Sequence, residues 1–178
     1  MKVSTQSSFW KEFMEYLKMI IFVVVVVLVV NNFLLINAKI PSESMEQTIM
    51  TGDRVFGNRL AYVFGDPERY DIIIFKYPDN EKELFIKRII GMPGETVEIK
   101  DGKVYMNGSK EPLKDSFTPE TPVGDYGPYT VPENSYFVLG DNRNYSKDSR
   151  FWNNPYVAED KILGKAVLKY FPGIKLLK

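Results

Sequence analysis

The hydrophobic pattern divides the chain into one long apolar run and a series of short alternating segments. Residues 19–36 read MIIFVVVVVLVVNNFLLI, in which Asn31 and Asn32 are the only polar residues. As a helix this run would be about 27 Å long, close to the hydrocarbon thickness of a bilayer. A helix is favoured in lipid even for a valine-rich segment, because its backbone polar groups bond to one another. The run therefore predicts a transmembrane helix, which we place at residues 19–37.

Two other interpretations of this run were weighed. A buried core helix would need a protein large enough to cover the valines at 23–27 on every side, and the chain has 178 residues. A cleaved secretion signal has a similar apolar block, but Ile36 and Ala38 make a weak small-residue cleavage pattern. We therefore predict a retained membrane span.

Positive charge around the run indicates its orientation. Lys2, Lys11 and Lys18 precede it, whereas Lys39 follows it directly. Basic residues favour the cytoplasmic side of a membrane span. We expect residues 1–18 to be a cytoplasmic segment and residues 38–178 to lie outside the cell membrane.

After residue 38 the pattern changes to short runs separated by Gly, Pro, Asn and Asp, which is typical of strands. Asp101-Gly102 joins two of these runs and predicts a type I′ hairpin, and Gly94 supplies positive φ for another tight turn. No segment beyond residue 38 has helical periodicity over three turns. The sequence thus predicts a mostly β, antiparallel domain behind a single transmembrane helix. The expected strands are 55–58, 71–77, 84–90, 96–100, 103–106, 136–139 and 165–171.

Residues 107–132 interrupt this pattern with many Pro, Gly, Ser and Thr residues. A segment of this composition buries little apolar surface. We expect a long surface excursion here and no second domain.

Composition removes several functional classes. Lys and Arg together number 23, as do Asp and Glu, so the net charge is zero and a nucleic-acid partner is not expected. The chain has no His and no Cys, which excludes Ser-His-Asp and Cys-His catalysis and removes the usual ligands of zinc, haem and Fe–S clusters. Calcium or magnesium on Asp and Glu stays open as an alternative, but the sequence has no loop of carboxylates at ligand spacing. We predict no metal and no cofactor. A serine nucleophile in this chain would need another base, and lysine is the remaining candidate.

Ser44, in the segment Pro41-Ser42-Glu43-Ser44-Met45 just beyond the apolar run, is the candidate nucleophile. The simple alternative is that both serines are turn or capping residues of a linker. Apolar neighbours let the segment pack against a sheet, and the spacing of Ser42 and Ser44 suits one nucleophile and one oxyanion donor.

Lys87 is the candidate base, because it lies in the apolar run Leu84-Phe85-Ile86-Lys87-Arg88-Ile89-Ile90. A strand lysine of this kind commonly snorkels or protects a sheet edge. If Lys87 is enclosed, desolvation lowers its pKa by up to ~3–5 units and raises the neutral fraction. Arg88 lies on the opposite face and is predicted to be a structural ion-pair donor.

A third segment, Gly140 to Trp152, is dense in Asp, Asn, Ser and Arg. It predicts either a solvated turn or an ordered, hydrogen-bonded loop. In an ordered loop Asp148 would pair with Arg150 or Arg143.

In this order, the three segments resemble those of the type I signal peptidases, membrane-bound enzymes that remove secretion signals. The motifs are PSESMEQTIMTGDRVFGNR, YDIIIFKYPDNEKELFIKRIIGMPGETVEI and YFVLGDNRNYSKDSRFW, following the apolar run. The resemblance implies a serine endopeptidase whose partners are secreted preproteins carrying signal peptides, and the lipid bilayer. The reaction that the resemblance implies needs no cofactor.

The resemblance also implies roles for individual residues. Ser44 matches the nucleophile, Lys87 the general base and Ser42 the hydroxyl that completes the oxyanion hole. Ser146 matches the serine that orients the lysine, and Asp148 and Arg150 match structural supports. Shallow pockets for small substrate side chains would be lined by Ile40, Pro41, Met45, Ile49, Leu84, Phe85 and Ile86.

Two positions depart from the family pattern. Gln47 stands where proline is common, and Tyr145 stands where a small asparagine is common. Neither change removes a reacting atom, so we expect altered tuning of activity.

Two further hypotheses come from other classes. The first is a non-catalytic, membrane-anchored β-domain that binds or chaperones exported proteins; the presence of Ser44, Lys87 and Ser146 argues against it. The second is a self-cleaving regulator using the same dyad, which the anchor and the lack of a basic DNA-binding helix disfavour.

Overall fold

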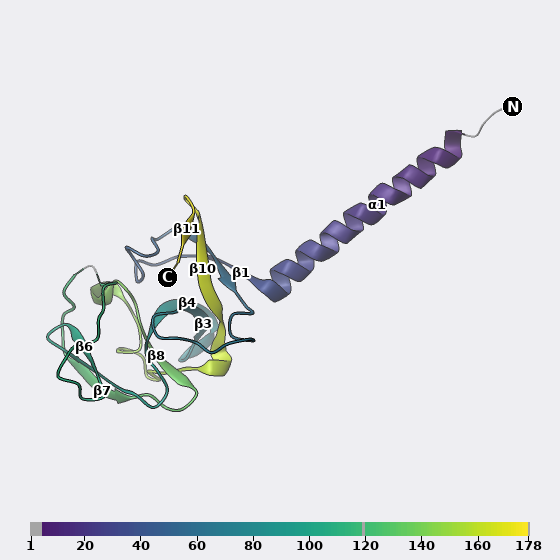
Figure 1. Cartoon of the computed structure of the whole chain (residues 1–178). Helices are drawn as coiled ribbons and strands as arrows, with labels where there is room; N and C mark the ends of the chain where they lie inside the picture. Colours follow the sequence, from purple (N-terminus) through teal and green to yellow (C-terminus); the bar gives the residue numbers. More distant parts are fainter. Residues whose placement is uncertain (1–4, 119, 178) are drawn as a thin grey trace. The chain divides into compact units, whose positions relative to one another are not determined.

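The computed structural model describes residues 5–118 and 120–177, with side chains from Phe9 onward. The chain divides into two compact units, one ending at Leu35 and one beginning at Ile36. Figure 1 shows the first unit as a single helix and the second as a β domain.

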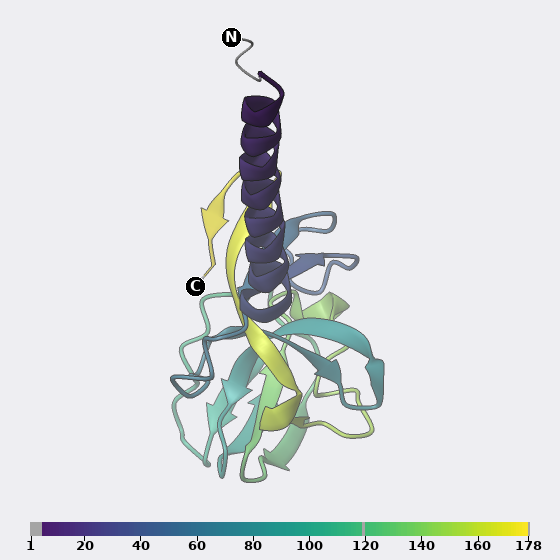
Figure 2. The ribbon, with the colours of Figure 1, turned by 90° about the vertical axis from the view of Figure 1, so that its right-hand side faces the viewer.

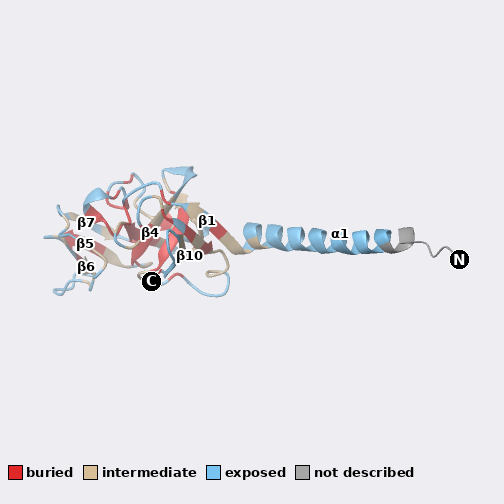
Figure 3. Ribbon diagram, turned by 90° about the horizontal axis from the view of Figure 1, so that it is seen from above, coloured by how far each residue is buried: buried red, intermediate tan, exposed pale blue. Residues whose placement is uncertain are grey.

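The N-terminal unit is helical throughout its described length. Helix α1 spans Thr5–Val29 and continues as a π-helical segment over Val30–Leu34. From residue 9 to residue 29 its side chains are exposed, as the pale blue ribbon of Figure 3 shows. The stretch Phe9–Leu34 is long and apolar enough to cross a membrane. Asn32 donates a hydrogen bond to the Leu28 carbonyl at 2.9 Å, so this polar side chain is satisfied within the helix.

The boundary of the helix differs from the expected span of 19–37. The helix ends at Leu34, and residues 35–37 belong to strand β1 (Leu35–Lys39). β1 pairs with β2 (Arg54–Asn58). At the end of the helix Leu35 has an extended backbone conformation, and its amide donates to the Val30 carbonyl. Hydropathy alone does not show this change, because Leu35 and Ile36 are as apolar as the helix.

The second unit is built from two antiparallel sheets, which confirms the predicted mostly β domain. The larger sheet has the strand order β1-β2-β10-β3-β4-β8-β9, with β11 also paired to β10. Its remaining strands are β3 (Ile72–Tyr77), β4 (Asn80–Gly91), β8 (Ser135–Leu139), β9 (Val157–Ala158), β10 (Ile162–Phe171) and β11 (Lys175–Leu176).

The smaller sheet has the order β6-β5-β7 and contains β5 (Thr96–Lys100), β6 (Lys103–Met106) and β7 (Tyr126–Thr130). Asp101 and Gly102 connect β5 to β6 with φ values of 48° and 71°, which confirms the predicted hairpin turn. Figures 1 and 3 place this sheet at one end of the domain and β1 with β10 at the other. Beyond Leu34, the described residues form two short 3₁₀ turns, Arg143–Tyr145 and Glu159–Lys161, and no α-helix.

Strand β10 is the long curved strand drawn in yellow in Figure 2. Its pairing with β2 shifts register between Ala166 and Leu168 and again between Lys169 and Phe171. Such bulges bend a strand and increase its twist. β10 lies between β2 and β3 in the sheet and pairs with both of them.

Three clusters of buried apolar side chains form the core of the domain. The first includes Met45 and Ile49 from the segment after β1, packed with Val55 and Ile72. The second is centred on Phe75, Trp152 and their neighbours, and the third joins the smaller sheet to β8. Because the segment 41–50 contributes two fully buried side chains, the nucleophile segment is part of the core and is not a free linker.

Strand β4 changes character along its length. β4 pairs with β3 from Leu84 to Arg88, but it pairs with β8 only from Arg88 onward, at Arg88↔Leu139, Ile89↔Val138 and Gly91↔Phe137. On the β8 side, the first part of β4 is therefore a free edge, and the part from Arg88 onward is paired. Lys87 lies where the edge ends.

The segment 107–132 differs from the expectation of a surface excursion that buries little. Residues 126–130 form strand β7, and the excursion also reaches the core. The Phe117 ring lies 3.6 Å from the Arg88 guanidinium carbon, and Asp115 forms an ion pair with Arg143. The strand was missed because Gly127 and Pro128 both disfavour a strand in sequence terms.

Candidate active site

The segment that carries Ser44 is fixed by its own backbone bonds and by two apolar anchors. The Ile40 amide donates to the Asp53 carbonyl at 2.9 Å, and the Gly52 amide donates to the Ile40 carbonyl at 2.8 Å. Between these points, the Ile49 amide donates to the Met45 carbonyl at 2.8 Å, and both side chains are fully buried. Ser44 is itself buried, so its hydroxyl has a defined position at the edge of the core.

Lys87 and Ser44 meet, although 43 positions separate them in the sequence. Lys87 Nζ lies 2.6 Å from Ser44 Oγ and 3.0 Å from the carbonyl oxygen of Ile86. The contact distance suits proton transfer between the hydroxyl and a neutral amine. Lys87 is 3% exposed, which answers the question of whether this lysine snorkels to solvent: it does not.

Burial changes the acid–base chemistry of Lys87. Desolvation lowers the pKa of its ammonium from 10.5 to about 8, and the negative charges of Asp148 and Asp141 oppose this change. At pH 7 roughly a tenth of such a lysine is neutral, compared with about 4 in 10⁴ at the ordinary pKa. The fold therefore converts an ordinary cation into a usable base.

Ser42 also reaches the nucleophile. Its Oγ lies 3.3 Å from Ser44 Oγ, and Ser42 itself is exposed on the cleft side. A hydroxyl at this distance can donate to an oxygen that develops negative charge beside Ser44.

The loop 140–150 is bonded to the nucleophile segment through its backbone. The Asn142 amide donates to the Ser44 carbonyl at 3.1 Å, and its side-chain amide donates to the Glu43 carbonyl at 3.2 Å. These bonds fix the peptide on either side of the reacting serine. The ordered-loop interpretation of the sequence is thus the correct one for this part of the loop.

Asp141 connects the two halves of the site, a role that the sequence did not reveal. Its carboxylate accepts two hydrogen bonds from Arg88, at 2.8 and 2.7 Å, and a third from Thr48 Oγ1 at 2.5 Å. Arg88 and Asp141 are fully buried. Arg88 is therefore the structural ion-pair donor that strand alternation predicted, and its partner lies 53 residues away.

Asp148 and Arg150 form the second buried ion pair of the site. This is one of the two pairings predicted for Asp148. Arg150 Nε donates to Asp148 Oδ1 at 2.8 Å and Nη2 donates to Oδ2 at 2.9 Å. Asp148 also accepts from the Gly140 amide at 3.0 Å, and Arg150 donates to the Arg143 carbonyl at 2.5 Å. These bonds stiffen the loop that bears Ser146.

Ser146 is buried beside Gly140 in this loop. A Cβ added to Gly140 would lie 2.2 Å from Ser146 Oγ and 2.4 Å from the Ser44 carbonyl oxygen. The three residues are thus in direct contact at the back of the site. Within the described residues Ser146 Oγ has no hydrogen-bond partner, so an orienting bond to Lys87 stays a prediction.

A cleft of about 540 Å³ opens onto the Ser44–Lys87 pair. Four of the residues expected to bind substrate line it: Pro41, Leu84, Phe85 and Ile86. Ile40, Met45 and Ile49 do not; they are buried in the first core cluster, against which Ile86 packs. The remaining lining residues are Ser42, Glu43, Ser44, Thr51, Lys87, Tyr145 and Lys147.

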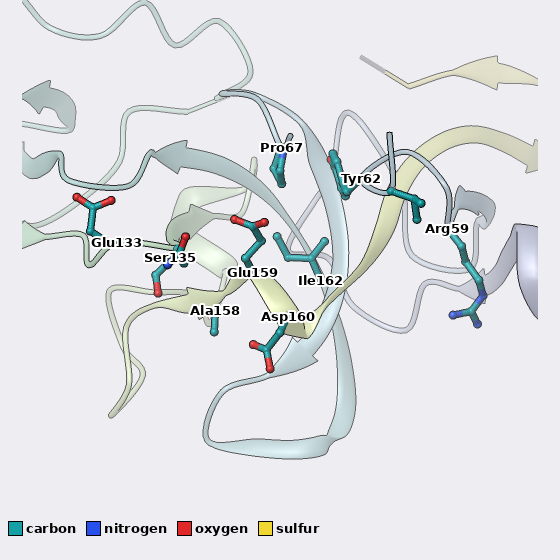
Figure 4. A pocket seen from close by; sticks show the side chains of 11 residues that line it. Arg59, Tyr62, Pro67, Glu133, Ser135, Ala158, Glu159, Asp160 and Ile162 are labelled. Atoms are coloured by element: carbon teal, nitrogen blue, oxygen red, sulfur yellow. The ribbon is translucent and has the colours of Figure 1, made fainter. Parts of the chain in front are cut away.

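A second cleft, of about 620 Å³, lies elsewhere on the domain and is drawn in Figure 4. Its labelled side chains include Tyr62, Glu159, Asp160 and Ile162. Ser135 is the one serine in its lining, and the lining contains no lysine. The larger cleft therefore lacks the chemistry that the smaller one has.

The chain is similar in sequence to known proteins. A family model described as signal peptidase, peptidase S26, matches residues 13–171. Signal peptidase I of Leptolyngbya laminosa is 42% identical over 166 residues, which cover 89% of this chain and 80% of that protein. Signal peptidase I of Bacillus amyloliquefaciens is 39% identical, with 89% and 85% covered. A crystal structure of a signal peptidase I from Enterococcus faecalis aligns at 36% identity with a TM-score of 0.49, over 57% of this chain and 97% of that chain.

Proposed function

The chain belongs to the signal peptidase family, peptidase S26, and on that basis we propose how its own residues perform the reaction. The protein is a serine endopeptidase that removes signal peptides from exported preproteins. The single observation that carries the mechanism is the 2.6 Å contact between Lys87 Nζ and Ser44 Oγ in a buried setting.

In the first step, neutral Lys87 accepts the proton of the Ser44 hydroxyl while Ser44 Oγ attacks the scissile carbonyl carbon. The carbonyl oxygen becomes an oxyanion, which the Ser44 amide and the Ser42 hydroxyl stabilise. The position of Ser42 Oγ, 3.3 Å from Ser44 Oγ, supports this assignment.

In the second step, protonated Lys87 donates its proton to the nitrogen of the leaving peptide, and the C–N bond breaks. The signal peptide stays bound to Ser44 as an ester. Neutral Lys87 then removes a proton from water, which attacks the ester and releases the signal peptide and free Ser44. Ser146 is assigned the orientation of the Lys87 amine, and Asp148 with Arg150 the support of this loop.

The substrate segment before the cut binds in an extended form along the free edge of β4. The edge at Leu84–Ile86 does not pair with β8, although the Ile86 carbonyl accepts from Lys87 Nζ, and an added strand would pair with the rest of this edge. Met45 and Ile49 lie below the cleft wall and limit the depth of the side-chain pockets. Shallow pockets of this kind select small side chains at alternate positions.

The N-terminal helix anchors the enzyme in the cell membrane. We assign residues 1–18 to the cytoplasm and 38–178 to the extracytoplasmic side, where a translocated preprotein emerges. The placement of Lys2, Lys11 and Lys18 before the apolar run supports this orientation. The lipid bilayer is then the second partner of the chain, beside the preprotein.

The experiment that tests the function uses the full-length protein in detergent with a preprotein that carries a signal peptide. Wild type should produce the size-shifted mature product, and Ser44→Ala should produce none. Thr51→Ala, at the rim of the cleft, serves as a folded control that keeps the dyad. Equal cleavage by wild type and Ser44→Ala would disprove the mechanism, and no cleavage by wild type would favour a non-catalytic binding domain.

A further inference from the structure

Lys147 is a charged residue of the active-site cleft that the reaction above does not use. It lines the cleft together with Tyr145, and its side chain is exposed. Its Nζ lies 5.0 Å from the ring centroid of Tyr77. The electron-rich face of an aromatic ring attracts a cation at this distance. The position of the ammonium group is thus defined, although the side chain faces solvent.

An aromatic pair links Lys147 to the catalytic lysine. The Tyr77 and Phe85 rings are stacked, with centroids 4.5 Å apart and an interplanar angle of 3°. Lys87 Nζ lies 5.4 Å from the Phe85 centroid. Lys147 therefore lies on the face of β4 that carries Phe85 and Lys87, and not on the face that carries Ile86.

The charge of Lys147 is available to a ligand. Among the described residues no carboxylate forms an ion pair with it. The acidic group that senses its field, Asp79, is already bonded to the amides of Asn153 and Asn154 at 2.9 Å each. The other charged groups that line the cleft are Glu43, on the nucleophile segment, and Lys87 itself.

The geometry of an extended substrate decides which of its residues face Lys147. Successive side chains of a strand point to opposite faces. If the first and third residues before the cut point toward the Ile86 side, the second residue before the cut and the first residue after it point toward the Phe85 side. These two positions face the ring pair and the ammonium of Lys147.

We propose that Lys147 is a specificity residue that favours preproteins with an acidic side chain at the second position before the cut or the first position after it. It disfavours Lys or Arg at the same positions, because like charges repel in the confined cleft. This inference rests on the proposed function, since it concerns which preproteins the same site accepts. The discrimination expected between Asp and Lys, for partly solvated charges several ångströms apart, is roughly tenfold in kcat/KM.

The test compares a set of precursors that differ at one position. Asp, Gln or Lys is placed at the second position before the cut, and separately at the first position after it. The kcat/KM of each is measured with full-length wild type, Lys147→Gln and Lys147→Glu. Lys103→Glu, an exposed lysine on β6 outside the cleft lining, gives the same change in net charge and serves as the matched control.

Wild type and Lys103→Glu should prefer Asp over Lys by roughly tenfold at one or both positions. Lys147→Gln should abolish the preference and Lys147→Glu should invert it. The preference of wild type should also shrink at about 1 M salt, where the Debye length falls to about 3 Å. This salt series needs no variant, so the proposal stays testable even if Lys147→Glu folds poorly.

An Asp-to-Lys ratio near one in wild type, or the same ratio in wild type and Lys147→Gln, would overturn the proposal. Cleavage of the Gln precursors by wild type but not by Ser44→Ala would still support the proposed function in that case. Failure of every precursor to be cleaved would instead count against the proposed function itself.

Discussion

Arg88, which directly follows Lys87 on β4, forms an ion pair with Asp141 through two hydrogen bonds. Neither side chain has any exposed surface. A buried charge of this kind is tolerated because its partner is present and because further polar groups saturate it. Thr48 supplies one of these groups to Asp141, and the carbonyl of Tyr70 accepts from Arg88 at 2.8 Å. The nucleophile segment and the base strand are thereby held by one charged cluster.

Asp141→Asn should destabilise the domain strongly. The substitution leaves the Arg88 guanidinium buried without a counter-charge, which costs about 3–5 kcal/mol in the free energy of unfolding. Chemical denaturation measures this loss. Glu98→Gln, which breaks the more exposed pair with Lys100, is the control and should change stability by less than about 1 kcal/mol. Similar losses for both variants would contradict the role assigned to Asp141.

Lys87→Met should abolish cleavage and raise stability near neutral pH by up to about 3 kcal/mol. Folding lowers the pKa of Lys87 from 10.5 to about 8, so the folded state must hold a disfavoured ammonium below pH 8. Between about pH 8 and 10.5 the unfolded chain binds more protons than the folded chain, and the stability of wild type rises with pH. Lys87→Met should lack this rise. Denaturation curves from pH 7 to 10.5 give the comparison, and parallel curves for the two proteins would rule the assignment out.

The pH dependence of cleavage should report the same group. Activity requires neutral Lys87, so kcat/KM should rise about tenfold per pH unit below the pKa of about 8 and level off above it. Steady-state rates from pH 6 to 9.5, on a precursor without titratable side chains near the cut, provide the measurement. A rate that keeps rising about tenfold per pH unit up to pH 9.5 would show that burial does not tune this residue.

Gly140→Ala should reduce cleavage by on the order of 10²-fold. The new Cβ would lie 2.4 Å from the Ser44 carbonyl oxygen, a backbone atom that can yield only if the nucleophile moves. Gly65→Ala, where the nearest atom is the Ala61 carbonyl oxygen at 3.6 Å, is the matched control and should retain activity. Full activity of Gly140→Ala would show that the loop relaxes without displacing Ser44.

Gln47 has a φ of 74°, three residues after the nucleophile. Proline holds φ near −65°, so Gln47→Pro should force the turn open and lower kcat/KM by roughly tenfold or more. Gln47→Gly relieves the strain of the positive φ, which raises stability, but it also gives the unfolded chain more conformational freedom, which lowers stability. Because these effects offset each other, the free energy of unfolding should change by less than about 1 kcal/mol. Equal activity of the two variants would show that this turn does not position Ser44.

The departure at Gln47 from the proline that is common in the family has a basis in backbone geometry. The turn in this chain has a conformation that proline does not adopt. The sequence shows a residue other than proline at this position, but the sign of φ becomes visible only in the structure.

Sequence patterns predicted the elements whose residues alternate clearly, and the faces of β4 follow from that alternation. Lys87 and Arg88 lie on opposite faces, as expected, because neighbouring strand residues always do. Strands β9 and β11 have two residues each, too few to give a periodic signal. β1 was hidden because its first residues continue the apolar run of the helix.

Long-range partners were the part of the site that the sequence did not specify. Asp148 and Arg150 are two residues apart, so their pairing was predictable from local chemistry. The contacts of Asp141 with Arg88 and Thr48 depend on how β4, β8 and the nucleophile segment pack together. The burial of Ile40, Met45 and Ile49 was likewise decided by packing, since apolar residues suit a pocket wall and a core equally well.

Under the proposed function, the residues of β4 that meet the preprotein and the residues that secure the domain occupy different stretches of one strand. Substitutions before Lys87 fall on the part of β4 that does not pair with β8, where they alter which substrate sequences are recognised. Those from Arg88 onward fall where β4 pairs with β8, in the buried part of the strand, and alter whether the protein folds. Homologous enzymes can therefore diversify in substrate repertoire through the outer stretch while the inner stretch remains under selection for integrity.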